Sequence, residues 1–585
     1  MRVLLLHPED SPERGPWASQ RWDRIIDAGI AGPNTYQRWS EKFCCPAEPL
    51  GLPGLEDFLL VRDTVASGLG RLLDDEGLDW WELNAILLYK EMETVSVLRR
   101  FAASLGKGDE LFATRPCFHA EALRFLAPNP PQCFHTNPAA RKGLGHYVRV
   151  ARKFPLGQLA EIFWDKYDAT YNFRTRFVSK PNLTGKPVVL LPSSYVNVSR
   201  VGLAYASILP RADFLLITTR RSGWVQSVPQ NVRVGKLVSY ASPRKATAKE
   251  LSKLIERWHR LRKELESVPE IALLGRLGFL DSFPEDFRRG LGVRDAWREV
   301  LDRENVRALL CGDDTNQSTR TPLLLARKRG IPSFICHHGA LDGRHLLRAQ
   351  PAAPIFAKGR MEEDYLLGFC RVPASEIEVG APAKSPVPSE NQARGLPRDP
   401  SAIVFFSEFY EVSGGRAEEF YRDLIAPLAE LALKTGRKFI VKLHPFEPLW
   451  ERERLVAKLL AADRRSAVQV VSGALTEEFF ARTWFGVTVL STVASECALR
   501  GIPCFLCKWL EFWPYRYIEQ YGKFGAGRVL NSAAEIATIP QLLENYSITP
   551  ETKAGLWQSI SPSRFEELLE SGVTRDGVVA AGKER

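Results

Sequence analysis

Short apolar runs that end in polar residues recur along this chain. The clearest of them are residues 3–6, 187–191, 214–217, 306–311, 402–406, 439–443, 485–490 and 504–507. Runs of this length are typical of strands that are covered on both faces of a parallel sheet. Longer stretches with helical apolar spacing lie between many of them, for example residues 55–105 and 246–268. This alternation predicts an α/β protein.

Two segments share one layout: a strand, a polar turn, a helix, a Gly-Ile-Pro stop and a second strand. They are residues 306–336 and 485–507. Because each is a βαβ unit in a different half of the chain, the fold class we predict is α/β with two facing Rossmann-like domains. We expect one domain in residues 1–390, with helical insertions, and a second in residues 391–545. Residues 546–585 are then a tail that partly packs back and is partly disordered.

Polar side chains gather where the strands of residues 438–503 end. Lys442 and His444 are two positions apart at the end of one strand, and Ser491 and Thr492 separate another strand from a helix. In an open parallel sheet, ligands bind beyond the carboxyl ends of the strands, where helix N-termini attract anions. Glu496 lies four residues after Thr492, whereas a capping box needs a spacing of three. Its carboxylate is therefore free to accept a hydrogen bond from a sugar hydroxyl.

Each of these residues also has an ordinary structural interpretation. Ser491 or Thr492 alone would be a helix N-cap, Lys442 a solvated strand end and His444 a turn residue. Taken together, the set indicates a site for a phosphorylated ligand.

The motifs in the last third of the chain support a resemblance. His444-Pro445 after a strand, with Ser491-Thr492 and Glu496 at a later helix, resembles the C-terminal domain of GT-B-fold glycosyltransferases of bacterial surface polysaccharides. Capsule-type Kdo and sialic acid transferases are most similar, with CDP-glycerol transferases as cousins. The resemblance implies that His444, Ser491 and Thr492 contact a cytidine nucleotide and its phosphate. It also implies a metal-independent enzyme that needs no cofactor.

Further residues are candidates for the chemistry of glycosyl transfer. Arg416 ends the loop Ser413-Gly414-Gly415, whose N–H groups form either an anion nest or an ordinary turn. Asp313 and Asp314 follow a strand and are candidate bases for the acceptor hydroxyl, although paired acids there also cap helices. A retaining enzyme would need no such base.

Two other segments carry polar groups just past a strand. Glu9 and Asp10 follow the first strand, in a place equivalent to that of Asp313 and Asp314. His338 belongs to a His-His-Gly element that resembles one in the CDP-glycerol transferases and is a candidate for acceptor or phosphate contact.

Composition and charge narrow the class of protein. The 585 residues are 45% hydrophobic and 25% charged, as in a globular protein, and the formal net charge is +10. This charge suits an anionic nucleotide sugar or an anionic membrane surface. No basic motif interleaved with aromatic residues indicates nucleic acid, so we expect no nucleic-acid partner. The ten cysteines, several of them inside apolar strands, indicate reduced thiols.

No apolar run approaches the length of a membrane span, which predicts a cytoplasmic protein with, at most, peripheral contact to the inner membrane. The function we predict is transfer of a sugar from a nucleotide donor to a surface glycan or glycolipid acceptor, with a CMP-linked acid sugar favoured over a UDP-sugar. Two alternatives stay open: an enzyme like UDP-sugar 2-epimerases, and a catalytically silent GT-B subunit that binds a glycan.

Overall fold

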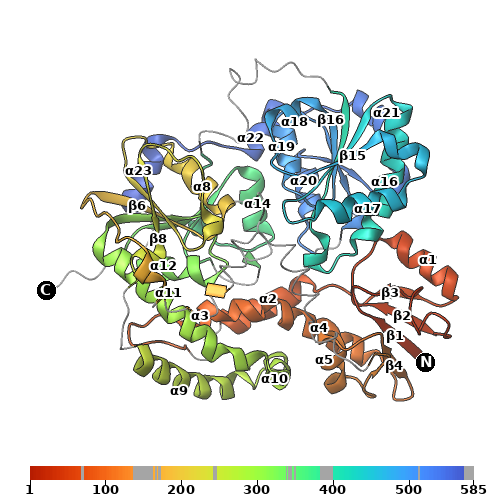
Figure 1. Cartoon of the computed structure of the whole chain (residues 1–585), viewed down its shortest axis with the longest axis horizontal. Coiled ribbons are helices and arrows are strands. Elements are labelled where there is room, and N and C mark those ends of the chain that lie inside the picture. The colour runs from red at the N-terminus through yellow and green to blue at the C-terminus, as the bar shows by residue number, and fades with distance from the viewer. Residues whose placement is uncertain are drawn as a thin grey trace.

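Three parallel β-sheets, each wrapped by helices, make up the molecule (Figure 1). The computed structural model describes residues 1–66, 71–135, 163–164, 168, 171, 173–241, 247–337, 339, 341, 346–347, 351–382, 400–511 and 514–571. In Figure 1 the N-terminal sheet lies below the C-terminal sheet, and the middle sheet lies to the left of both.

The N-terminal sheet has five strands in the order β3-β2-β1-β4-β5. They are β1 (Arg2–Leu6), β2 (Arg24–Asp27), β3 (Ala47–Pro49), β4 (Glu110–Ala113) and β5 (Gln132–Cys133). Their helices are α1 (Pro33–Phe43), α2 (Leu55–Ala66), α3 (Trp80–Asn84), α4 (Tyr89–Ala103) and α5 (Phe118–Leu126). The predicted first strand is confirmed, but it opens a sheet of its own and does not join the strand at residue 187.

The middle sheet has seven strands in the order β12-β11-β10-β9-β6-β7-β8. They are β6 (Pro187–Ser193), β7 (Phe214–Thr218), β8 (Val232–Lys236), β9 (Asn305–Cys311), β10 (Ser333–Ile335), β11 (Ile355–Ala357) and β12 (Ile377–Val379). Its helices are α8 (Val196–Ala206), α9 (Thr247–Leu265), α10 (Pro269–Arg276), α11 (Phe283–Arg303), α12 (Gln317–Lys328) and α14 (Arg360–Gly368).

The C-terminal sheet has six strands in the order β15-β14-β13-β16-β17-β18. They are β13 (Ala402–Phe406), β14 (Lys438–Lys442), β15 (Val468–Val471), β16 (Thr483–Thr488), β17 (Cys504–Cys507) and β18 (Arg528–Leu530). The helices here are α16 (Ala417–Lys434), α17 (Leu449–Leu459), α18 (Glu477–Arg482), α19 (Val493–Leu499), α20 (Tyr517–Lys523) and α21 (Ile539–Glu544).

The middle and C-terminal sheets are both doubly wound. In each, the first strand lies beside the fourth, the second and third strands continue toward one edge of the sheet, and the later strands continue toward the other edge. The predicted α/β fold with two Rossmann-like domains, the GT-B arrangement, is therefore confirmed. The N-terminal sheet follows the same order on a smaller scale. Residues 1–390 thus contain two sheets, where the sequence predicted one.

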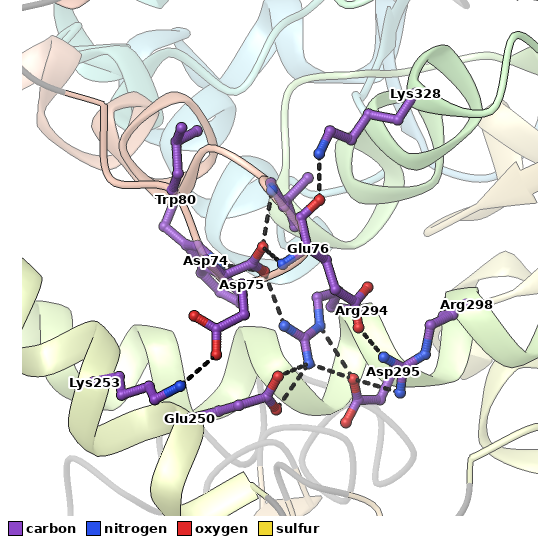
Figure 2. A network of polar contacts seen from close by, with 12 residues as sticks. Asp74, Asp75, Glu76, Trp80, Glu250, Lys253, Arg294, Asp295, Arg298 and Lys328 are labelled. Atoms are coloured by element: carbon purple, nitrogen blue, oxygen red, sulfur yellow. Dashed lines mark hydrogen bonds and ion pairs between the residues drawn. The ribbon is translucent and has the colours of Figure 1, made fainter.

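Helices from the N-terminal part reach under the middle sheet, where a buried arginine anchors them (Figure 2). The guanidinium of Arg294 on α11 is 0% exposed and pairs with Asp74 at 2.8 Å, Glu250 at 3.0 Å and Asp295 at 2.7 Å. Asp74 also accepts a hydrogen bond from the indole of Trp80 at 2.9 Å. The loop before α3 is therefore fixed to the helical layer of the middle sheet.

The end of the chain crosses from the C-terminal sheet to the middle sheet through α22 (Pro550–Leu556) and α23 (Pro562–Ser571) (Figure 1). Ile560 N donates to Ala381 O at 2.9 Å, just past β12. Phe565, Leu568 and Leu569 on α23 are buried in the apolar core of the middle sheet. The last helix thus covers one face of that sheet.

The fold also bears on the cysteines and on the length of apolar helices. All ten cysteines are free thiols, and the four inside apolar runs, Cys311, Cys336, Cys504 and Cys507, are buried as predicted. Within the described ranges, no helix combines the length and the apolar character that crossing a bilayer requires.

Candidate functional site

The carboxyl end of β13 lies at the point where the C-terminal sheet changes direction, between β14 and β16. In doubly wound sheets this is the crevice where ligands bind. Glu408, two residues after β13, lies there half-buried. One of its carboxylate oxygens accepts from Leu490 N at 2.6 Å and from Thr488 Oγ1 at 3.3 Å, so Glu408 ties the ends of β13 and β16 together.

Burial raises the pKa of Glu408 to about 7. The hydrogen bonds from Leu490 and Thr488 favour the charged form, but they do not offset the desolvation of the carboxylate. Glu408 is therefore partly protonated at neutral pH. A carboxyl group with a displaced pKa in a crevice is a typical feature of functional sites.

His444 lies at the carboxyl end of β14 in a turn held by three hydrogen bonds. Its backbone N donates to Glu447 Oε2 at 2.9 Å, and its Nδ1 accepts from Phe446 N at 3.3 Å. The third bond runs from Glu447 N to His444 O at 2.9 Å. Burial lowers the pKa of His444, so the imidazole is neutral at pH 7. Because Nδ1 is an acceptor, the neutral ring carries its proton on Nε2.

Glu447 anchors this turn to the neighbouring strand. The buried carboxylate accepts from Ser407 Oγ at 3.0 Å and pairs with Arg452 Nε at 2.8 Å. Burial raises the pKa of Glu447. The ends of β14, β13 and β16 are therefore joined through Glu447, Ser407 and the adjacent Glu408.

Lys442 does not share the surface of His444 in the way the sequence predicted. Its side chain is 5% exposed, and its ammonium donates to Leu443 O at 3.0 Å and Gly473 O at 2.7 Å. Burial lowers the pKa of this lysine. Lys442 therefore joins β14 to the loop after β15, and we correct its predicted role as a phosphate ligand.

Ser491 and Thr492 lie between β16 and α19, as predicted. Ser491 is half-buried and Thr492 exposed, and Ser491 Oγ accepts weakly from Val493 N at 3.4 Å. A Cβ built on Gly339 would lie 3.9 Å from the Thr492 methyl group. Since Gly339 follows β10 of the middle sheet, the carboxyl edges of the two Rossmann-like sheets face each other at this point.

Glu496 lies one helical turn after Thr492 and is partly exposed. Its carboxylate is 3.8 Å from the guanidinium of Arg500, which also pairs with Glu477 at 2.6 Å. Burial raises the pKa of Glu496. The position is compatible with the predicted contact to a sugar hydroxyl.

Arg416 is part of a contact between the C-terminal and N-terminal sheets. Its guanidinium pairs with Asp27 at 2.6 and 2.8 Å and donates to the backbone oxygens of Asp10 and His7 at 2.5 and 3.1 Å. The loop before it pairs with Ile30, which donates to Gly414 O and accepts from Arg416 N. We therefore correct the predicted phosphate role of Arg416. Of the two interpretations of the loop, the structure favours the ordinary turn, because the N–H groups of Gly414, Gly415 and Arg416 all donate to backbone oxygens.

Asp313 and Asp314 are both buried at the carboxyl end of β9. Asp314 pairs with Arg320 at 2.8 Å and accepts from Ala352 N at 3.0 Å. Asp313 accepts from Thr315 N at 2.8 Å and from Asn316 Nδ2 at 3.0 Å. Asp313 thus holds its own loop together, and Asp314 ties that loop to α12 and to Ala352. The N-cap of α12 is Asn316, so neither carboxylate is the helix cap that the structural interpretation described, and their pairing corrects the prediction of a base here.

The other two acids that follow a strand are also held in ion pairs. Asp10 and Glu9 both pair with Arg115, which follows β4 of the N-terminal sheet. His338 lies outside the described residues; its neighbour His337 is buried.

Sequence reasoning missed Glu408 and Glu447. The strand at residues 402–406 was predicted, and the same rule that singled out His444 and Ser491 applies to the two residues after it, Ser407 and Glu408. Glu447 carried no comparable signal, because its partners Ser407 and Arg452 come together only in the fold. Among the described residues, no group of three or more metal-ligating side chains is present.

No protein-family model and no curated protein matches this chain. Solved structures do match. The UDP-GlcNAc 2-epimerase of Neisseria meningitidis, bound to UDP-GlcNAc, is 12% identical over 66% of this chain and 99% of its own, with a TM-score of 0.42. The UDP-GlcNAc 2-epimerase of Methanocaldococcus jannaschii is 12% identical over 66% of this chain and 99% of its own, with a TM-score of 0.41. MurG of Acinetobacter baumannii is 12% identical over 66% of this chain and 98% of its own, with a TM-score of 0.35.

Proposed function

We propose that the chain is a glycosyltransferase that moves a sugar from a cytidine or uridine nucleotide to a glycan or glycolipid acceptor, with a CMP-linked acid sugar as the favoured donor. The observation that carries the proposal is the meeting of two Rossmann-like carboxyl edges at Gly339 and Thr492, of which the edge of the C-terminal sheet also carries His444 and Glu408. A donor held on one edge would meet an acceptor held on the other. We keep the predicted domain boundary near residue 390 as part of this proposal.

The donor would bind to the C-terminal sheet. Nε2–H of His444 and the hydroxyls of Ser491 and Thr492 are the groups we assign to the phosphate, and Glu496 to a sugar hydroxyl. Glu408 would position the turn after β16 through Leu490 and Thr488. Because Glu408 is partly neutral at pH 7, it repels an anionic phosphate less than an ordinary carboxylate would.

The reaction would break the bond between the anomeric carbon and the nucleotide oxygen and form one to the acceptor oxygen. The nucleotide leaves as an anion, and the proton of the acceptor hydroxyl passes to the departing phosphate or to solvent water. Donors aimed at the phosphate stabilise this developing charge.

The test is a thermal-shift and calorimetric titration of the full chain with CMP, CDP, UDP and GDP. A ligand at 100 times its Kd that binds only the folded state stabilises it by about 2.7 kcal/mol. We expect stabilisation by CMP that is lost in His444→Ala and kept in His259→Ala, an exposed histidine on α9. No response to any nucleotide would overturn the proposal.

Selective stabilisation by UDP would favour a hexose transferase or an enzyme like the UDP-sugar 2-epimerases. The two differ in product, because a transferase releases free nucleotide only when an acceptor is present, whereas an epimerase releases none.

A further inference from the structure

Three large apolar side chains are exposed to solvent just past the carboxyl end of β14. Phe446 is 67% exposed, Trp450 is 57% exposed and Leu449 is 37% exposed. Exposed apolar groups in one place mark a binding surface more often than single ones do. Phe446 is the member that touches the candidate site, because its ring centroid is 5.2 Å from that of His444.

The backbone that presents Phe446 is fixed. The turn from His444 to Glu447 is closed by the three hydrogen bonds described above. Glu447 is in turn held by Arg452, whose guanidinium also pairs with Glu411 at 2.7 Å. A ligand that meets the Phe446 ring therefore loses little affinity to the ordering of the loop.

We infer that Phe446 is a stacking platform for the base of the bound nucleotide. This inference rests on the proposed function, in which His444 contacts the phosphate. The base of a nucleotide lies one ribose away from its phosphate, and the Phe446 ring lies beside His444 on the solvent side. Aromatic rings stack on bases without reading their hydrogen-bonding edges, so this contact adds affinity for any nucleotide.

The neighbouring apolar groups distinguish a base from a larger partner. Trp450 lies on the first turn of α17, and the guanidinium of Arg454 lies 5.9 Å from its ring. A lipid surface or an extended glycan would use Trp450 and Leu449 together with Phe446. A single base needs Phe446 alone.

The experiment compares CMP with ribose 5-phosphate, which lacks a base, on the full chain by calorimetry. In Phe446→Ala we expect CMP affinity to fall about tenfold, the value of one stacked base, and affinity for ribose 5-phosphate to stay unchanged. Trp450→Ala is the matched control and should change neither affinity. In Phe446→Trp, CMP affinity is kept and the new indole fluorescence is quenched by CMP.

Several outcomes would overturn the inference while the proposed function stands. CMP affinity that is unchanged in Phe446→Ala but lost in His444→Ala would place the base elsewhere. Equal loss of both ligands would mean that Phe446 shapes the turn, and a lowered melting point would support that reading. Equal losses in Phe446→Ala and Trp450→Ala would indicate a larger partner. If no nucleotide binds the unaltered chain, the inference and the proposed function fail together.

Discussion

Arg416 and Asp27 form a two-point ion pair that joins the C-terminal sheet to the N-terminal sheet, with N–O distances of 2.6 and 2.8 Å. Asp27 ends β2 and is 1% exposed. The pair lies directly before α16, in the segment that also carries Glu408. The N-terminal sheet therefore supports the backbone from which the candidate site is built.

Asp27→Ala should destabilise the chain strongly, because it leaves the charge of Arg416 buried without its carboxylate. Breaking a buried pair from one side costs about 3–5 kcal/mol. The midpoint of urea unfolding, followed by tryptophan fluorescence, measures this loss. Glu256→Ala is the control, since it breaks the exposed pair with Arg260, worth about 0.5 kcal/mol. Equal effects of the two variants would contradict the interpretation of Arg416 as a clamp between sheets.

The central strands of the two larger sheets were predictable because they are continuous apolar runs, whereas the edge strands β8, β15 and β18 carry polar or charged residues and were not predicted. β13, for example, is Ala-Ile-Val-Phe-Phe and is buried throughout. The N-terminal sheet was not predictable as a separate unit. Its strands β2 and β3 have only four and three residues, and each includes charged side chains. Such short segments carry no periodic signal, and only pairing with β1 makes them strands.

The site was predictable where it depends on strand ends and not where it depends on distant partners. His444, Ser491 and Thr492 follow from the positions of β14 and β16. The true partner of Arg416 is 389 positions away in sequence, and that of Lys442 is in the loop after β15. Long cationic side chains reach whichever acceptor the fold brings near, so sequence position alone does not assign them.

Asp314→Asn should lower stability, because it removes the charge that Arg320 pairs with inside the middle domain. Arg320 still has its ion pair with Glu82, at 2.8 Å. The variant therefore loses one charge-assisted hydrogen bond, which should lower the free energy of unfolding by about 1.5–3 kcal/mol. Asp313→Asn keeps the bond from Thr315 N to its amide oxygen and loses the bond from Asn316 Nδ2. Because the lost bond comes from a neutral amide and not from a guanidinium, this variant should cost less. Thermal unfolding of both variants measures this order. An Asp314→Asn protein with unchanged stability and no turnover would restore the prediction of a base.

Phe565→Ala should show that the last helix is an integral part of the middle domain. Phe565 is 0% exposed and lies edge-on to Phe356 and tilted against Tyr205, at centroid distances of 5.8 and 5.7 Å. Removing a buried ring of this kind costs about 3–5 kcal/mol. Chemical denaturation measures the loss, with Phe125→Ala, an exposed phenylalanine on α5, as the control. Similar small effects in both variants would mean that α23 is only loosely attached.

Glu408 should make stability depend on pH in a predictable direction. Its pKa is raised from 4.5 to about 7 by burial, so the folded chain holds this proton more tightly than the unfolded chain does. The stabilising contribution is therefore complete below pH 4.5 and is lost as the pH rises through 7. Glu408→Gln carries no titrating proton, and the stability of the native chain relative to this variant should fall across that window.

The measurement is the urea midpoint of both proteins at intervals between pH 4.5 and 8, because the difference between them cancels the titration of other groups. Glu544→Gln, an exposed glutamate at the end of α21, controls for the substitution. Added CMP provides a second readout: a phosphate near Glu408 disfavours its ionised form, so the drop in relative stability should move to higher pH. A difference curve that is flat from pH 4.5 to 8 would mean that the carboxylate is better solvated than its burial and contacts indicate.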